Sequence, residues 1–339
     1  MAENHRSDIL FAAAIVLLLT VAWHIRDVLL LIYVAALFAV VISPAIGFVQ
    51  AARIGRWRPS RGLAVLTIIF GVVVIATLLL LFLAPPIVRD LQSFSAELPK
   101  RLEQFYDRIE HLPFGSHINP RSLQEYAATA VGGVFGLFAG IAGGVFGFVS
   151  WMVLTIYFII DGERAFEWGL SFIPIYYRGR MRMTLHRAEG RVSKWLLGQG
   201  LLMILLGTAS AITFRLLDVR YSLALGVFAG LVNIVPVVGP IAAAALATSV
   251  AAFDSWNKAA GVLIFFVVYQ QLENAFLTPK IMKSTVDLPA LAVIIALAIG
   301  GKLAGVVGAL VAVPTAALIG VLADEYLVHR TTAHPTGED

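Results

Sequence analysis

Runs of about 20 apolar residues recur along the whole chain, and this repetition limits the chain to one fold class. Apolar residues make up 59% of the sequence and charged residues only 14%, whereas an average soluble chain has about 25% charged residues. The pattern predicts an all-α polytopic membrane protein with about eight membrane segments. The net charge is only +4 and the basic residues fall in loops, so they indicate topology and not a nucleic-acid-binding surface.

The alternation of apolar and polar stretches divides the chain into six parts. We expect N-terminal membrane helices at 1–84, an extracytoplasmic amphipathic helical region at 85–129, a Gly-rich membrane helix at 130–160, a cytoplasmic basic amphipathic segment at 161–194, a C-terminal membrane core at 195–322 and a cytoplasmic tail at 323–339. The loop before residue 62 holds arginines 53, 56, 58 and 61 and no acid. The positive-inside rule places this loop, and with it both termini, in the cytoplasm.

Two features of the region between 62 and 160 predict helix packing. Pro85-Pro86 should close the third span, and the apolar positions of 91–109, three or four residues apart, then predict an amphipathic helix that Pro99 would kink. This helix could pack on the membrane core, lie in the interface or contact a second copy. Further on, Gly136, Gly140 and Gly144 line one helical face, which is typical of close helix packing within a protomer or between subunits.

The apolar segment 222–250 is interrupted near its middle by Asn233-Ile-Val-Pro-Val-Val-Gly-Pro240. Pro236, Gly239 and Pro240 are hard to keep in one continuous helix. Backbone groups released by a break cannot face lipid, so the break must be buried in protein or line a wet cavity. We therefore take Asn233, Pro236, Gly239 and Pro240 as candidate substrate-binding residues.

The last apolar region, 288–322, is too long for one ordinary span and is also interrupted. Gly300, Gly301, Lys302 and Gly305 mark the interruption and form the second half of the candidate substrate site. Each broken segment either crosses the membrane or folds back as a re-entrant hairpin, and the sequence leaves both topologies open.

The segment 259–276 ends in a polar cluster, and its members complete the candidate site: Gln270, Gln271, Glu273 and Asn274. Glu273 is the one acid placed well inside an apolar segment, so it is the candidate for coupling an ion to transport. The alternative is a carboxylate at the membrane interface, capped by its neighbours.

Three motifs give the chain a family resemblance. Asn233–Pro240 resembles the Pro-x-x-Gly-Pro signature of the autoinducer-2 exporter family, and Gln270–Met282 resembles that family's Gln-x-Glu-Asn…Pro-Lys segment. Leu288-Pro289, Gly300-Gly301, Gly305, Gly308 and Pro314 resemble its glycine-rich last segment, and Gly198-Gln199 also fits. Lys302 beside the Gly-Gly pair and Asp218 in place of a more usual glycine depart from the pattern.

The resemblance implies secondary transport of a small solute across the bacterial inner membrane by a multi-pass protein. Members are associated with export of the furanone-type signal autoinducer-2 in quorum sensing, and others look like Na⁺(Li⁺)/H⁺ antiporters. Homo-oligomers and elevator-like movement of the hairpin-bearing parts are also implied. The partners expected are thus the lipid bilayer, further copies of the chain, and a small polar solute or a monovalent cation, with no nucleic acid.

The residue types in the candidate site favour some of these functions over others. A hydroxyl-rich, weakly charged solute suits the neutral amides and the exposed ends of broken helices. Cation/proton antiport needs a titrating acid, and Glu273 is nearly the only candidate. The sequence has no cysteine, no His-x-x-x-His pair, no Gly-x-Ser-x-Gly elbow and no P-loop, so we expect no enzyme activity, no cofactor and no metal. A non-transporting scaffold is the remaining alternative, and it would leave the two breaks unexplained.

Overall fold

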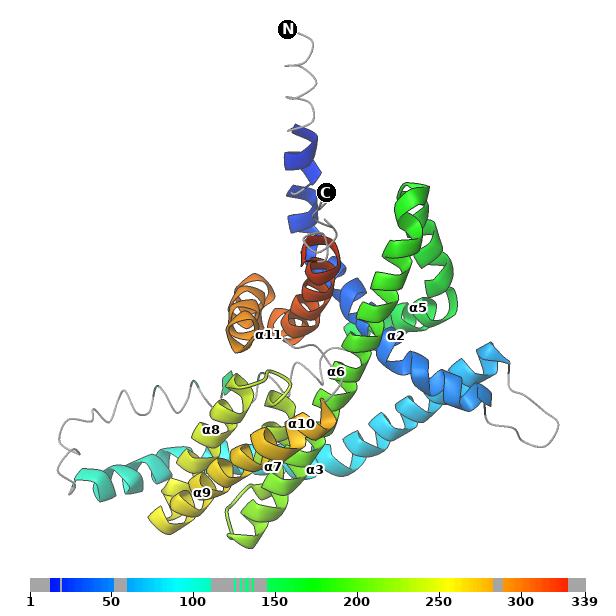
Figure 1. Cartoon of the computed structure of the whole chain (residues 1–339). Helices are drawn as coiled ribbons and strands as arrows, with labels where there is room; N and C mark the ends of the chain where they lie inside the picture. The colour runs from blue at the N-terminus through cyan, green and yellow to red at the C-terminus, as the bar shows by residue number, and fades with distance from the viewer. Residues whose placement is uncertain are drawn as a thin grey trace, which may run out of the picture. The chain divides into compact units, whose positions relative to one another are not determined.

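The computed structural model describes residues 13–18, 20–51, 60–110, 125, 129, 132–133, 136, 145–282 and 289–328. Throughout these ranges the regular structure is helical, with no strand (Figure 1). Five of the described helices are long and apolar enough to cross a membrane. The expected all-α polytopic fold class is therefore confirmed.

The helices are distributed over two compact units, which are described separately. Unit 1 consists of 1–65, 146–193 and 286–339, and unit 2 of 66–145 and 194–285. The C-terminal membrane core that we expected at 195–322 thus contributes to both units.

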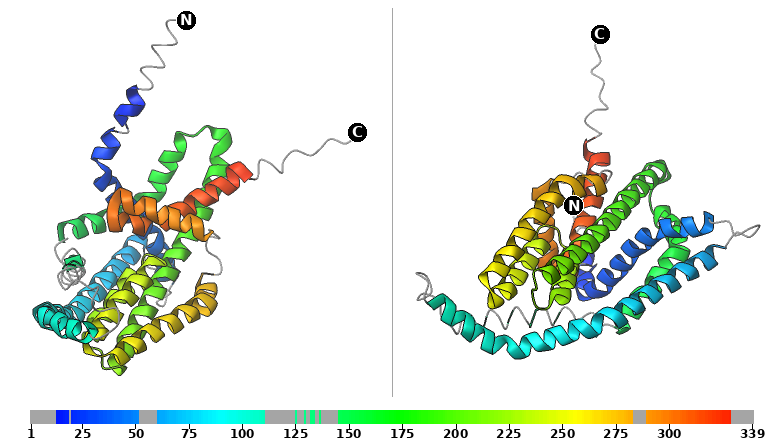
Figure 2. Two further views of the ribbon diagram at one scale, coloured as in Figure 1. Left: turned by 90° about the vertical axis from the view of Figure 1, so that its left-hand side faces the viewer. Right: turned by 90° about the horizontal axis from the view of Figure 1, so that it is seen from below.

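Unit 1 contains α2 (Arg26–Ala51), the first turn of α3 (Arg61–Glu110), α5 (Val145–Ser171), the first half of α6 (Ile175–Leu216), α11 (Ala290–Ala323) and the short π-helix η3 (Asp324–Val328). Figure 2 shows α5 and α6, in green, joined by the short connection at 172–174. α2 packs on α5 through an edge-to-face contact between Phe38 and Trp151, with ring centroids 4.8 Å apart. The Tyr33 hydroxyl lies 2.9 Å from the Thr315 hydroxyl and ties α2 to α11.

The segment 290–323 folds back on itself. Helical geometry is lost at Ala304 (φ −145°) and Gly305 (φ 58°), where the positive φ favours glycine. In a continuous helix residues 300 and 308 would be about 12 Å apart. Here a Cβ added to Gly308 would lie 1.9 Å from the Gly300 carbonyl oxygen. The second broken segment is therefore a helical hairpin, with one arm on each side of residues 304–305.

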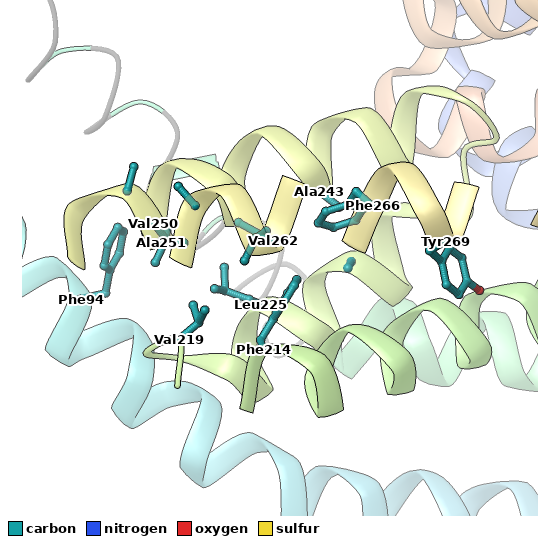
Figure 3. Close-up of a cluster of buried hydrophobic side chains, with 14 of the residues drawn as sticks. Phe94, Phe214, Val219, Leu225, Ala243, Val250, Ala251, Val262, Phe266 and Tyr269 are labelled. Atoms are coloured by element: carbon teal, nitrogen blue, oxygen red, sulfur yellow. The ribbon is translucent and has the colours of Figure 1, made fainter. Parts of the chain in front are cut away.

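Unit 2 contains the rest of α3 and α6, together with α7 (Ser222–Val232), α8 (Val238–Asp254), α9 (Trp256–Leu272), the π-helix η2 (Glu273–Leu277) and α10 (Thr278–Ile281). Apolar side chains from α3, α6, α7, α8 and α9 form one buried cluster around Phe214, Leu225, Ala251 and Val262 (Figure 3). Phe214 and Val262 are completely buried. This cluster is the hydrophobic core that holds together the helices of unit 2, which carry the candidate site residues.

We expected Pro85-Pro86 to close the third span, but no helix ends there. α3 continues without interruption from Arg61 to Glu110, through Pro85, Pro86 and Pro99. Each proline removes one helical hydrogen bond and costs about 3 kcal/mol. Packing offsets this cost, because Leu91, Phe94, Leu98 and Leu102 are all buried against unit 2. Of the alternatives for this amphipathic helix, packing on its own chain is the one observed.

Ion pairs connect α3 to the end of the 222–254 segment, and other ion pairs connect the two ends of that segment to each other. Arg101 Nη1 donates to Asp254 Oδ1 at 2.7 Å, and Arg101 Nη2 donates to Glu97 Oε2 at 2.6 Å. Arg220 Nε lies 3.6 Å from Asp254 Oδ1. Lys258 Nζ donates to Asp218 Oδ2 at 3.0 Å and holds the pKa of that carboxyl below its usual range. Asp218 therefore keeps this contact at neutral pH and loses it only as the pH falls through the lowered pKa.

Replacing Arg101 with leucine should lower the free energy of unfolding by about 2 kcal/mol. Removing one partner of a buried ion pair costs about 3–5 kcal/mol, and Arg220 and Lys258 still reach Asp254 in the variant. Thermal melting in detergent would measure the change. Arg164→Leu is the matched control, because the Arg164 side chain is 89% exposed and should lose less than about 0.5 kcal/mol. Equal melting temperatures for both variants would contradict the assigned role.

Candidate functional site

The α7–α8 segment is a helical hairpin. Its two ends meet, because Lys258 at the start of α9 bonds Asp218 just before α7. Near the tip, a Cβ added to Gly239 would lie 2.0 Å from the Val232 carbonyl oxygen. The two arms, of 11 and 17 residues, are about 16 and 25 Å long at 1.5 Å per residue. The segment is therefore two helices folded back on each other and not one continuous helix.

The tip of this hairpin has a strained backbone. Val237 has φ 67° and ψ −55°, and Val238 N donates to the Pro236 carbonyl oxygen at 2.7 Å. Together these define a γ-turn of the rare type that lies near φ +75° and ψ −65°. A β-branched residue at positive φ is a clear conformational outlier. Strain of this kind persists only where the surroundings enforce it, and it is concentrated at functional sites.

The motif residues each have a place in the turn. Pro236 supplies the carbonyl that closes the γ-turn. Gly239 is buried where α8 passes the end of α7, and its missing side chain permits that approach. Pro240 is in the first turn of α8, where a missing N–H costs nothing in helical hydrogen bonds.

Asn233 brings a polar side chain into the interior of unit 2. It caps the end of α7 and is 1% exposed, and its Nδ2 has no hydrogen-bond partner among the described residues. Gln199 of α6, itself buried, donates from Nε2 to the Asn233 carbonyl oxygen. This bond satisfies one of the carbonyls that α7 leaves free at its C-terminus. An unpaired buried amide costs about 1–3 kcal/mol, so the Asn233 side chain is available to a ligand.

Glu273 is a further buried polar group of unit 2. It is 7% exposed, and its Oε2 has no hydrogen-bond partner among the described residues. It opens η2, where Thr278 N donates to the Glu273 carbonyl oxygen five residues back. Single π-turns inside α-helices are frequent at functional sites. Glu273 lies within a continuous helical run from Trp256 to Ile281.

Tyr269 lies one turn before Glu273 and close enough to interact with it. The Tyr269 hydroxyl is buried and has no partner of ordinary hydrogen-bond geometry among the described residues. The same holds for the Ser210 hydroxyl of α6. In Figure 3 Tyr269 lies at one end of the apolar cluster, with its hydroxyl turned away from the other labelled side chains. Tyr269, Gln199 and Ser210 are not among the site residues expected from the sequence. The Gly198-Gln199 pair that fits the family resemblance was a usable signal for Gln199, whereas a Tyr in an apolar helix gave none.

α6 brings three of the sequence motifs together. Gln199 bonds the hairpin tip at Asn233. At the preceding residue, a Cβ added to Gly198 would lie 3.1 Å from Ile281 Cγ2, at the end of the segment that carries Glu273. The motifs around 198, 233–240 and 270–282 are thus neighbours within one unit.

Other predicted site residues are placed elsewhere. Gln271 and Asn274 are exposed, and Gln270 Nε2 donates to Asn274 Oδ1 at 3.3 Å, so these amides do not share the burial of Glu273. Gly300, Gly301, Lys302 and Gly305 belong to unit 1. We assigned the break to Gly300, Gly301, Lys302 and Gly305, and of these only Gly305 lies in it, because the non-helical residues are Ala304 and Gly305. The correction has a simple reason: Gly300 and Gly308 are helical and allow the two arms to touch.

The glycine stripe is described only in part. Gly140 and Gly144 lie outside the described residues. Gly136 is helical and exposed, and no atom lies within 4 Å of a Cβ added there. Packing through this stripe therefore stays a prediction.

Comparison with known proteins gives consistent matches. A family model described as "AI-2E family transporter" matches residues 11–328. The chain is 27% identical to "Putative transport protein YhhT" of Escherichia coli (strain K12), over 89% of this chain and 86% of that protein. It is 26% identical to "Putative transport protein YrrI" of Bacillus subtilis (strain 168), over 73% of each chain. The match to "Putative transport protein YueF" of the same organism, at 25% identity, covers 69% of this chain and 64% of that protein.

Proposed function

Because the chain belongs to the AI-2E transporter family and is a multi-pass membrane transport protein, we propose that it exports a small polar solute through a pathway that includes the α7–α8 tip. The observation that carries this proposal is that two of the buried, unpartnered polar groups in unit 2 are Asn233 Nδ2 and Glu273 Oε2, one an amide and the other a carboxyl group. Both groups cost free energy in an apolar interior. A solute that bonds them would recover that cost.

The chemistry of these groups favours a neutral, hydroxyl-rich solute of the autoinducer-2 type. Asn233 offers an amide donor, Tyr269 and Ser210 offer hydroxyls, and Glu273 offers a carboxyl group. Such groups match hydroxyl and carbonyl groups of a ligand. No Lys or Arg appears among the buried unpartnered groups of the described residues, so a strongly anionic solute would lack a counter-charge.

We further propose that Glu273 couples export to protons. A buried carboxylate without a cationic partner is costly, and neutralisation by a proton removes most of that cost. No ion pair to Glu273 is found among the described residues, although other carboxylates of unit 2 have several. Proton binding at Glu273 and solute binding would then depend on each other.

The topology in the membrane completes the proposal. If the arginines at 53–61 face the cytoplasm of a bacterial inner membrane, α3 carries Arg101, and with it both ends of the α7–α8 hairpin, to the outer side. The 11 residues of α7 would reach about 16 Å inward, near the middle of a core about 30 Å thick. Two hairpins and two compact units suit an elevator-like movement, with a homo-oligomer as its fixed frame.

Efflux from proteoliposomes tests the proposed function. Vesicles loaded with a furanone-type diol, a linear polyol, an organic anion or Na⁺ should release the diol or polyol at least about ten times faster than protein-free vesicles, the anion and Na⁺. Release should accelerate when the pH gradient is applied. Transport of the organic anion alone, or no solute release at all, would contradict the proposal.

A further inference from the structure

A cavity of about 340 Å³ lies wholly within unit 1. It is surrounded by α2, the first residue of α3, α5, α6 and the second arm of α11. Most of its lining is apolar and includes Leu37, Val40, Phe158 and Leu318. Its size is in the range of small-molecule sites, about 300–1,000 Å³. None of the groups assigned to the transport pathway above lines it.

The polar lining of this cavity contains both signs of charge. Arg61 donates from Nη2 to the Ile159 carbonyl oxygen at 3.1 Å, and among the described residues its other N–H groups have no partner that would compete with a ligand. Glu189 Oε2 lies 3.1 Å from His186 Nδ1. Glu163 forms no ion pair with any described residue. The cavity thus offers one guanidinium and two carboxylates.

These charged residues occupy the ends of apolar stretches. Arg61 immediately precedes the apolar stretch that begins at Gly62, Glu163 follows the stretch that ends at Ile160, and Glu189 precedes the one that begins at Trp195. Such junctions lie at the level of the lipid head groups. The apolar lining from α2 and α11 lies within membrane segments. The cavity is therefore polar at head-group level and apolar at acyl-chain level.

We propose that this cavity binds a phospholipid with a zwitterionic, primary-amine head group, as in phosphatidylethanolamine. Its phosphate is placed at Arg61, because a guanidinium binds phosphate through paired N–H donors. Its ammonium group is placed at Glu163 and Glu189, and its upper acyl chain in the apolar part. A primary ammonium group has three N–H donors for these carboxylates, whereas a choline head group has none. A lipid with an anionic head group and no amine would place its charge beside the carboxylates of Glu163 and Glu189 without an ammonium group to pair with them.

Native mass spectrometry of the full chain, stripped of lipid in detergent, tests this assignment. Titration with phosphatidylethanolamine should show one tightly bound lipid per protomer, with an affinity at least about tenfold above that for phosphatidylcholine or phosphatidylglycerol. The double variant Glu163→Gln/Glu189→Gln should lose this preference. Ala39→Leu, which adds volume at a buried position in the apolar lining, should weaken binding of all three lipids.

Arg164→Gln is the matched control. It changes a charge on α5 that does not line the cavity, so it should bind lipid as the wild type does. Melting temperatures establish that each variant is folded. Equal wild-type affinity for phosphatidylethanolamine and phosphatidylglycerol would overturn the proposal, and so would unchanged selectivity in the folded double variant. Free ethanolamine phosphate that binds as tightly as the lipid would overturn the assignment to a membrane lipid.

Discussion

Gly239→Ala should abolish transport and destabilise unit 2 by at least about 3 kcal/mol, at or above the upper end of the usual range for a single substitution. The added Cβ would lie 2.0 Å from the Val232 carbonyl oxygen and 2.8 Å from Asn233 Cα. Both are backbone atoms, so no side-chain rotation can relieve the overlap. The tip of the hairpin must open, and Asn233 must then leave its bond with Gln199.

Gly200→Ala provides the control for this prediction. Gly200 is helical in α6, and no atom lies within 4 Å of a Cβ added there. Replacing a helical glycine with alanine normally stabilises a helix by about 1 kcal/mol. Melting temperature and proteoliposome efflux should therefore be unchanged or slightly higher in Gly200→Ala. A Gly239→Ala protein with wild-type efflux would show that the close approach at the tip is not needed.

Glu273→Gln should remove the response of transport to a pH gradient. The substitution keeps the size of the side chain and replaces the carboxyl group by an amide that cannot titrate. Without a proton-carrying group, export down a solute gradient can continue, but a pH gradient should no longer accelerate it. We expect the ratio of efflux with and without the gradient to fall to about one, from a wild-type ratio of at least about five, equivalent to about 1 kcal/mol of coupling.

Glu103→Gln is a suitable control for Glu273→Gln. Glu103 is an exposed acid on α3, so its neutralisation should leave the ratio at the wild-type value. A Glu273→Gln protein that still responds fully to the pH gradient would eliminate Glu273 as the coupling group. The proposal for the solute pathway at Asn233 would survive that result, because efflux without a gradient reports on it separately.

Part of this architecture follows directly from the sequence. The apolar runs predict an all-α membrane fold, and two prolines with a glycine between 236 and 240 predict a break whatever the surroundings. Whether such a segment crosses or folds back depends on contacts between residues far apart in the chain, such as Lys258 with Asp218. Local propensity contains no information about such contacts.

The wrong predictions have the same cause. Pro85, Pro86 and Pro99 should interrupt α3, yet packing of Leu91, Phe94, Leu98 and Leu102 keeps it continuous. Gly300 was taken as part of the break, but Gly300 is helical and contacts Gly308. The break itself needs only the positive φ of Gly305.

Asp218 was noted as a departure from the more usual glycine at that position. Its φ of 51° lies in the left-handed region, which aspartate tolerates better than most residues.

The candidate site was only partly predictable. Asn233 and Glu273 were found because polar residues inside apolar segments are rare and costly. Gln270, Gln271 and Asn274 met the same criterion, yet Gln271 and Asn274 are exposed and Gln270 bonds Asn274. The side of a helix that faces the interior is decided by tertiary packing, and near Glu273 it also depends on the π-turn.

The central claim, that the α7–α8 tip faces a watery solute pathway, can be tested most directly by thiol labelling, because the chain contains no cysteine. Val238→Cys places one thiol at the tip, where the side chain is 56% exposed, and Ile264→Cys places one on the outer face of α9, where it is 62% exposed. In proteoliposomes, a charged maleimide should label position 238 at least about ten times faster than position 264, because lipid excludes the reagent from the latter. The transported solute should protect position 238. Equal labelling of the two positions, or labelling of 238 that solute does not slow, would contradict the account.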